Sequence, residues 1–247
     1  MTLRIGFDLD GVLADMESEL LRQAELLFGK AASPPPREPS AATGAADTRG
    51  GIEDDAPEPD ADAVPPARFT LTARQQRRLW KHVAGIENFW ETLEECEPGA
   101  VRGLAGAAAE RRWEIIFLTK RPQSAGACAQ LQTQRWLRSR GFELPSVFVV
   151  KGSRGRIAAA LPLDVVVDDT PENCLDVIAD SKARPILVWR YKVEQVPAAT
   201  ARLGIAVVGT IAECLELLTD FPGSTPARGD RQHDSSSSPA VSPAGNR

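Results

Sequence analysis

Four short apolar runs in this 247-residue chain each end in side chains that could do chemistry together. In chain order these side chains belong to Asp8 and Asp10, Thr119 and Lys120, Lys151, and Asp168 and Asp169. If the four runs are parallel strands, their carboxyl ends meet at one edge of a sheet, where α/β proteins place their sites. Each group alone has an ordinary explanation as a turn, a helix cap or a solvated charge. Four such groups at successive strand ends favour a functional site.

The carboxylates of this set indicate a metal ion. Acids that share one sheet edge repel and desolvate each other unless a hard cation neutralises them. Asp8, Asp10, Asp168 and Asp169 are therefore candidate ligands for Mg²⁺, which prefers oxygen donors. Asp8 and Asp10 are two residues apart, so one could attack a substrate while the other handles protons.

The remaining groups suit an anion. A hydroxyl and ammonium groups opposite a cation would hold phosphate oxygens, which makes Thr119, Lys120 and Lys151 candidates for phosphoryl binding. Further basic residues nearby, Arg121, Arg154 and Arg156, are either a solvated face or a funnel for an anionic substrate.

The elements that position these residues alternate between strands and helices. The predicted strands are Leu3–Asp8, Ile115–Thr119, Val147–Val150, Val165–Val167, Ile186–Trp189 and Ile205–Val208, each a short β-branched or apolar run. The predicted helices between them are Ala100–Arg112, Gln123–Arg140, Pro171–Ser181 and Thr210–Thr219. This order predicts an α/β fold with a doubly wound parallel sheet.

The interval after the first strand breaks that alternation. Met16–Gly29 and Leu71–Val83 read as amphipathic helices, so residues 15–97 form a small helical cap over the carboxyl edge. The core is then 1–14 with 98–221. Residues 31–66 carry eight acidic residues and two arginines with few large apolar side chains, and 222–247 contain a Ser235–Ser238 run; both segments are predicted to be disordered.

Composition excludes several classes of protein. A net charge of −5 with 43% hydrophobic residues argues against a basic nucleic-acid coat and a fully disordered chain, and no apolar run approaches a membrane span. Five residues before Gly6 are too few for a signal peptide. The cysteines have no metal-like spacing and read as buried, reduced thiols, which suggests the cytoplasm.

The motifs resemble a known superfamily. F-D-L-D-G-V-L-A-D, F-L-T-K-R-P, an isolated lysine and V-V-D-D-T-P are similar, in order, to the four motifs of the haloacid dehalogenase-like (HAD) hydrolases. The resemblance covers residues 3–30 and 98–190. The first motif, together with N-F-W-E-T-L-E at Asn88–Glu94, looks most like the 5′(3′)-deoxyribonucleotidases.

The resemblance implies a role for each site residue. Asp8 would be the nucleophile that forms an aspartyl-phosphate, and Asp10 the acid that protonates the leaving oxygen and then activates water. Thr119 and Lys151 would hold the phosphoryl group. Asp8, the main-chain carbonyl of Asp10, and Asp169 would bind Mg²⁺, with Asp168 one shell out. This sequence departs from the nucleotidase pattern at Lys120-Arg121-Pro122.

The expected activity is a Mg²⁺-dependent phosphomonoesterase acting on a small phosphorylated substrate, foremost a (deoxy)nucleoside 5′-monophosphate. Sugar phosphates and polynucleotide ends are alternative substrates, and a non-catalytic receiver-like switch is an alternative function. No membrane or stable nucleic-acid partner is expected, and the oligomeric state is open. Phe89 and Trp90 are either a platform for a base or part of the cap core.

Overall fold

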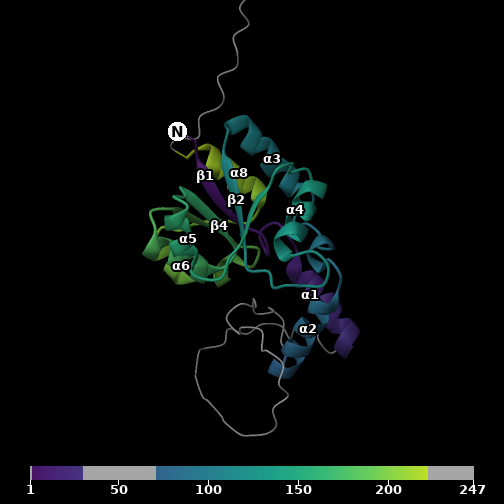
Figure 1. Cartoon of the computed structure of the whole chain (residues 1–247). Helices are drawn as coiled ribbons and strands as arrows, with labels where there is room; N and C mark the ends of the chain where they lie inside the picture. Colours follow the sequence, from purple (N-terminus) through teal and green to yellow (C-terminus); the bar gives the residue numbers. More distant parts are fainter. Residues whose placement is uncertain (1, 30–70, 222–247) are drawn as a thin grey trace, which may run out of the picture.

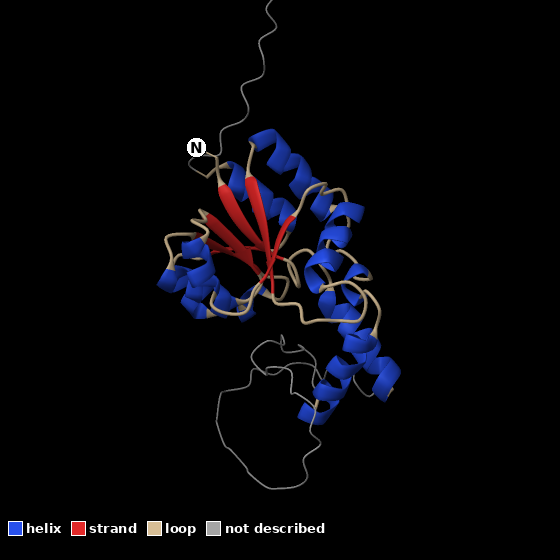
Figure 2. Cartoon of the chain, viewed as in Figure 1, coloured by secondary structure: helices blue, strands red, loops and turns tan. Residues whose placement is uncertain are grey.

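A six-stranded parallel sheet forms the centre of the computed structural model, which describes residues 2–29 and 71–221 (Figure 2). The strand order is β3-β2-β1-β4-β5-β6. The strands are β1 (Arg4–Asp8), β2 (Glu114–Thr119), β3 (Ser146–Val149), β4 (Val165–Asp168), β5 (Arg184–Val188) and β6 (Ala206–Val208). All six predicted strands and the parallel α/β sheet are confirmed. The predicted disordered segments 31–66 and 222–247 lie outside the described residues.

The sheet register places the sequence motifs side by side. Phe7 of β1 pairs with Phe117 of β2 on one side and with Val167 of β4 on the other. The residues that follow these three positions therefore leave the sheet at the same level. Because β1 lies between β2 and β4, its carboxyl end is the centre of that edge.

Helices cover both faces of the sheet (Figure 1). The helices α5 (Arg154–Ala160) and α6 (Pro171–Asp180) pack together on one face, over Leu118 and Val166. The other face is covered by α3 (Ala100–Arg111), α4 (Ala129–Ser139) and α8 (Ile211–Thr219) and holds the larger apolar core. A short helix α7 (Ala198–Arg202) precedes β6.

One predicted helix needs correction, and one helix was not predicted. The helix expected over Gln123–Arg140 begins only at Ala129. The residues before it are held by contacts with Asn88 and do not take a helical path. The Asn88 carboxamide oxygen accepts from the Ala127 amide at 3.0 Å, and Gly126 has φ +88°, where a Cβ would lie 2.5 Å from that oxygen. Helix α5 was missed altogether because its seven residues carry no clear apolar period.

Two helices follow β1 before the chain returns to the sheet, and both were predicted. Helices α1 (Met16–Phe28) and α2 (Ala73–Gly85) pack against each other, and the His82 ring contacts the Gln23 carboxamide oxygen at 2.9 Å. Figure 1 shows this pair beyond the carboxyl end of β1. No helix in the described ranges has the length and apolar character required to cross a membrane.

The chain returns to the core through a segment that is fastened to α4. The short 3-10 helix η3 (Phe89–Glu91) lies against α4, and the Trp90 amide donates to the Gln132 side-chain oxygen at 3.0 Å. The Trp136 indole of α4 donates to the Leu93 carbonyl at 2.7 Å. The end of the cap is therefore a fixed part of the core surface.

Candidate active site

Asp8 lies at the end of the central strand and is almost buried, with 7% of its surface exposed. Its carboxylate accepts a hydrogen bond from Nη2 of Arg154, the first residue of α5. Arg154 is itself buried, and its Nε donates to Oδ2 of Asp168 at 3.2 Å. One guanidinium thus joins the acids that end β1 and β4.

Close packing of α5 on α6 brings Arg154 to this position. Ser153 caps α5, its hydroxyl accepting from the Arg156 amide, and Gly155 then lies against α6. A Cβ at Gly155 would come within 2.0 Å of the Asp176 carbonyl oxygen. The glycine therefore permits the helix contact that points Arg154 at Asp8.

A nitrogen of Arg154 has no partner in the described part of the chain. Nη1 is buried and makes no hydrogen bond, whereas Nε and Nη2 are both engaged. A buried unpaired donor costs roughly 1–3 kcal/mol and more when charged. An acceptor supplied by a ligand would remove that cost.

Asp10 is held by two side chains from the end of β2. The Thr119 hydroxyl donates to Oδ2 of Asp10 at 3.1 Å. The Arg121 guanidinium donates to both oxygens, with Nε at 3.0 Å from each and Nη2 at 2.7 Å from Oδ1. Asp10 and Thr119 are therefore in contact, as the strand ends led us to expect, and Arg121 contacts the same carboxylate.

Asp168 and Asp169 follow β4 and differ in their surroundings. Asp168 accepts from the Asn173 carboxamide at 3.0 Å and from the Thr170 amide at 2.9 Å, in addition to Arg154. Asp169 lies under the first loop, where a Cβ at Gly11 would be 2.2 Å from its Oδ2. With φ +88°, Gly11 is the residue type that this close approach requires.

Burial and the surrounding charges raise the pKa of Asp8 well above its ordinary value. Desolvation is the largest cause, and the carboxylates of Asp168, Asp169 and Asp10 add to it, outweighing the nearby Arg154. A cation beside Asp8 would oppose this shift and favour the charged form.

The donors at this edge fit a hard cation in part. Within residues 2–29 and 71–221, no three carboxylate, imidazole or thiol side chains converge as a metal site. The Asp168 oxygens are taken up by protein donors, and the Asp10 carboxylate is taken up by Arg121 and Thr119. Asp8 accepts from Arg154, and Asp169 accepts from the Thr170 hydroxyl at 3.2 Å. These two carboxylates could hold Mg²⁺ through their oxygens, with main-chain oxygen and water completing its shell.

The basic residues divide into two groups. Arg121 and Arg154 are buried in ion pairs and cannot form a surface funnel, so that interpretation is wrong for both. Arg156 is exposed, with 85% of its side chain accessible, and its Nε lies 3.8 Å from a carboxylate oxygen of Asp180. Lys120 is half-buried next to Thr119, and Lys151 is exposed in the turn before α5.

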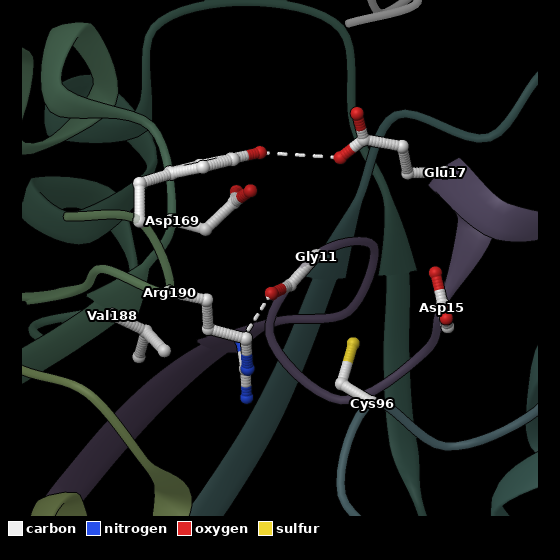
Figure 3. A pocket seen from close by; sticks show the side chains of 8 residues that line it. Gly11, Asp15, Glu17, Cys96, Asp169, Val188 and Arg190 are labelled. Carbon is white, nitrogen blue, oxygen red and sulfur yellow. Dashed lines mark hydrogen bonds between the residues drawn. The ribbon is translucent and has the colours of Figure 1, made fainter. Parts of the chain in front are cut away.

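A pocket of about 140 Å³ opens beside Asp169 (Figure 3). It is lined by Gly11, Asp15, Glu17, Cys96, Asp169, Val188, Arg190 and Tyr191. The Tyr191 hydroxyl donates to Glu17 at 3.1 Å, and Arg190 donates to the carbonyls of Gly11 and Val12. Sequence reasoning missed Arg190 and Tyr191; their position directly after β5, at the same edge, was the available signal.

The structure settles the exposure of two aromatic residues and three cysteines. Phe89 and Trp90 are fully buried, so they belong to the core and offer no open platform. Cys174 and Cys214 are buried as predicted, whereas Cys128 is exposed, which contradicts the prediction for that residue. Cys128 precedes α4 at its N-cap, on the irregular segment that replaced the expected helix.

Comparison with known proteins identifies the fold. No protein-family model matches the chain, and no curated protein matches it either. Among solved structures, a HAD family hydrolase from Deinococcus radiodurans R1, with bound phosphate and sodium, aligns at TM-score 0.53 and 17% identity over 92% of this chain and 99% of that one. The fold is that of the HAD hydrolases.

A second solved structure aligns over a similar range. A hydrolase from Pseudomonas syringae aligns at TM-score 0.50 and 17% identity over 90% of this chain and the whole of that one. Asp8, Asp10, Thr119 and Asp168-Asp169 lie at the strand ends that the resemblance to the HAD motifs assigned to them. Arg154, three residues beyond Lys151, contacts the first aspartate, and the phosphoryl-binding role of Lys151 stays a prediction.

Proposed function

We propose that this protein is a Mg²⁺-dependent phosphomonoesterase that acts through an aspartyl-phosphate on Asp8. The observation that carries the proposal is the pairing of Asp8 with Arg154, whose Nη1 is buried and unpartnered among the described residues. A phosphoryl oxygen beside Asp8 would supply the missing acceptor. The HAD-like fold is consistent with this chemistry and does not by itself establish it.

The first step is attack of an Asp8 oxygen on phosphorus, with the P–O bond to the leaving group breaking. Asp10 in its protonated form gives its proton to the leaving oxygen. Arg154, together with Thr119, Lys120 and Lys151, would stabilise the charge on the transferring group. A Mg²⁺ ion held by Asp8, Asp169 and the Asp10 carbonyl would neutralise the phosphate and the clustered carboxylates.

The second step returns the protein to its starting state. Asp10, now a carboxylate, takes a proton from water as the water oxygen attacks the phosphorus of the Asp8 phosphate. Inorganic phosphate leaves and the Asp8 carboxylate is regenerated. The same residue thus serves as acid and then as base, which requires its oxygens to stay in place between the two steps.

The pocket beside Asp169 is the candidate site for the leaving group, and we propose a (deoxy)nucleoside 5′-monophosphate as substrate. Burial of Trp90 removes the platform that the sequence suggested, and Tyr191 is the aromatic side chain that lines the pocket instead. Its ring meets Trp189 edge-on, with centroids 5.1 Å apart. Carboxylates of Asp15 and Glu17 in the same pocket could equally accept sugar hydroxyls, which keeps sugar phosphates as the alternative.

A phosphate-release screen tests the activity. Wild-type protein and Asp8→Asn are incubated with nucleoside monophosphates, sugar phosphates, 5′- or 3′-phosphorylated oligonucleotides and p-nitrophenyl phosphate, with Mg²⁺ or with EDTA. Release by the wild type that needs both Asp8 and Mg²⁺ supports the proposal. Failure to release phosphate from any of them, or equal release by Asp8→Asn, would contradict it and favour a switch-like role.

Two substitutions at Tyr191 distinguish the substrate classes. If a base stacks on the ring, Tyr191→Ala weakens nucleotide use by about 1–3 kcal/mol, Tyr191→Phe is tolerated and sugar phosphates are spared. If the hydroxyl and Glu17 recognise a sugar, both variants weaken sugar phosphate use alike. Equal rates for all three proteins on all substrates would place the leaving group elsewhere.

A further inference from the structure

We propose that Arg121 is the positioning residue for Asp10, holding the acid–base carboxylate in one orientation through both half-reactions. The inference rests on the phosphomonoesterase activity proposed above and concerns a residue to which that mechanism gives no role. Sequence reasoning placed Arg121 either on a solvated face or among the basic groups of an anion funnel. The structure instead places it beneath the site, with none of its side chain exposed.

The contacts of Arg121 are directed at one carboxylate. Its Nε and Nη2 donate to the two Asp10 oxygens, and its Nη1 donates to the Thr133 hydroxyl at 2.9 Å. The Thr133 hydroxyl donates in turn to the Ala129 carbonyl at 2.7 Å. All three guanidinium nitrogens are therefore engaged, and the group is tied to helix α4 on the side opposite Asp10.

Two indole rings enclose the guanidinium. The Arg121 Cζ atom lies 5.1 Å from the ring centre of Trp90 and 5.9 Å from that of Trp136. The rings are fixed by hydrogen bonds, from the Trp90 indole to the Pro122 carbonyl at 2.9 Å and from the Trp136 indole to the Leu93 carbonyl. A cation held this way cannot turn toward an incoming phosphate, so its action on the substrate passes through Asp10.

This arrangement answers a demand of the chemistry. Asp10 must present an oxygen to the leaving group and later to water, and a displacement of about 1 Å at such a group can cost about 10²-fold in rate. Thr119 holds one oxygen from the side, and a two-point contact with a rigid guanidinium fixes the plane of the carboxylate. The alternative is a buried ion pair that serves only stability.

Leaving-group dependence separates these two roles. Arg121→Lys keeps the charge but loses the two-point contact, and it is compared with the wild type on an alkyl phosphate and on 2,4-dinitrophenyl phosphate. Mispositioned Asp10 should slow the alkyl ester by about 10²–10³-fold, because its leaving oxygen needs a proton. Dinitrophenolate needs none, so its first-turnover release should stay within about threefold. The second step still needs Asp10 and should then limit turnover, giving a burst of dinitrophenolate.

The matched control is Arg135→Gln, which removes an exposed arginine of α4 that pairs with Glu91 at 3.1 Å. It should show wild-type rates on both esters. Thr133→Val supplies a second test if Arg121→Lys fails to fold. It removes only the hydrogen bond between Arg121 Nη1 and the Thr133 hydroxyl, so it should slow the alkyl ester selectively, but by a smaller factor. Equal losses on the two esters without a burst, or no loss at all, would overturn the positioning role. Absence of turnover in the wild type would instead contradict the proposed function.

Discussion

The charged form of Asp8 is disfavoured by burial and by three neighbouring acids, yet the role of nucleophile proposed for Asp8 requires that charge. The Arg154 guanidinium partly offsets this effect, because it is buried beside Asp8 and contacts the carboxylate directly. The pKa of Asp8 is nevertheless raised, so the charge of Arg154 does not fully offset burial and the neighbouring acids. The proposed Mg²⁺ ion, if bound beside Asp8, would lower this pKa and favour the charged form.

Arg154→Lys tests the compensation at the residue scale. A lysine keeps one charge but cannot reach Asp8, Asp168 and a phosphoryl oxygen together, so turnover should fall by about 10²–10³-fold, the usual loss of a preorganised donor. The control is Arg156→Gln on the same helix, an exposed residue whose loss should change the rate by less than about fivefold. Steady-state rates that ranked the two variants the other way would contradict the assignment.

At the scale of elements, Gly155 and Trp90 position the segments that carry Arg154 and Arg121. Gly155 lets α5 approach α6 until only a hydrogen fits against the Asp176 carbonyl. Trp90 fixes η3 to the loop after β2 and covers Arg121. Both residues act on Asp8 or Asp10 through packing, without touching them.

Gly155→Ala should separate α5 from α6 and move Arg154 away from Asp8. The added Cβ would meet backbone, which cannot yield as a flexible side chain can, so overpacking should cost about 1–3 kcal/mol of stability. The melting temperature and the rate of phosphate release should both fall. Gly152→Ala is no suitable control because Gly152 has φ +132°. Gly106→Ala in α3, with open space at its Cβ, should leave the rate unchanged and raise stability by about 0.5–1 kcal/mol, the opposite sign.

Trp90→Ala should behave as a core substitution. Truncating a fully buried tryptophan typically costs about 3–5 kcal/mol, so the melting temperature should drop. Nucleotides and p-nitrophenyl phosphate should lose activity alike, because the ring supports Arg121 rather than a base. Loss confined to nucleotides with an unchanged melting temperature would restore Trp90 to a substrate-binding role.

The strand ends were predictable because their signals are local. Short apolar runs that end in acid or hydroxyl predicted the sheet and brought Asp8, Asp10, Thr119 and Asp168 to one edge. The roles of Arg154 and Arg121 were not predictable, since an arginine in a short polar stretch reads as solvated. Their burial depends on how α5 and α4 pack against the sheet, which is a property of the tertiary fold.

On the scale of the whole molecule, the chain combines a parallel sheet with a helical lobe inserted where β1 ends. The pocket lies between the two, bordered by Asp15 and Glu17 of the lobe and by Arg190 and Tyr191 of the core. Arg190 also pairs with Glu97, which ties the returning segment to the loop after β5. A substrate in this pocket would contact both parts, so the residues that line the pocket should determine which leaving groups are accepted.

The most direct test of the account is to trap the covalent intermediate. Protein mixed with a substrate and Mg²⁺ is quenched in acid within the first turnovers, digested, and its peptides are analysed by mass spectrometry. The account predicts one phosphoryl group on Asp8, and none in Asp8→Asn or with EDTA. With 2,4-dinitrophenyl phosphate, whose leaving group needs no proton, more of it should accumulate in Asp10→Asn, because only the second step is slowed. Turnover by the wild type with no phosphoryl group on Asp8 in either protein, or with the group on another residue, would contradict it.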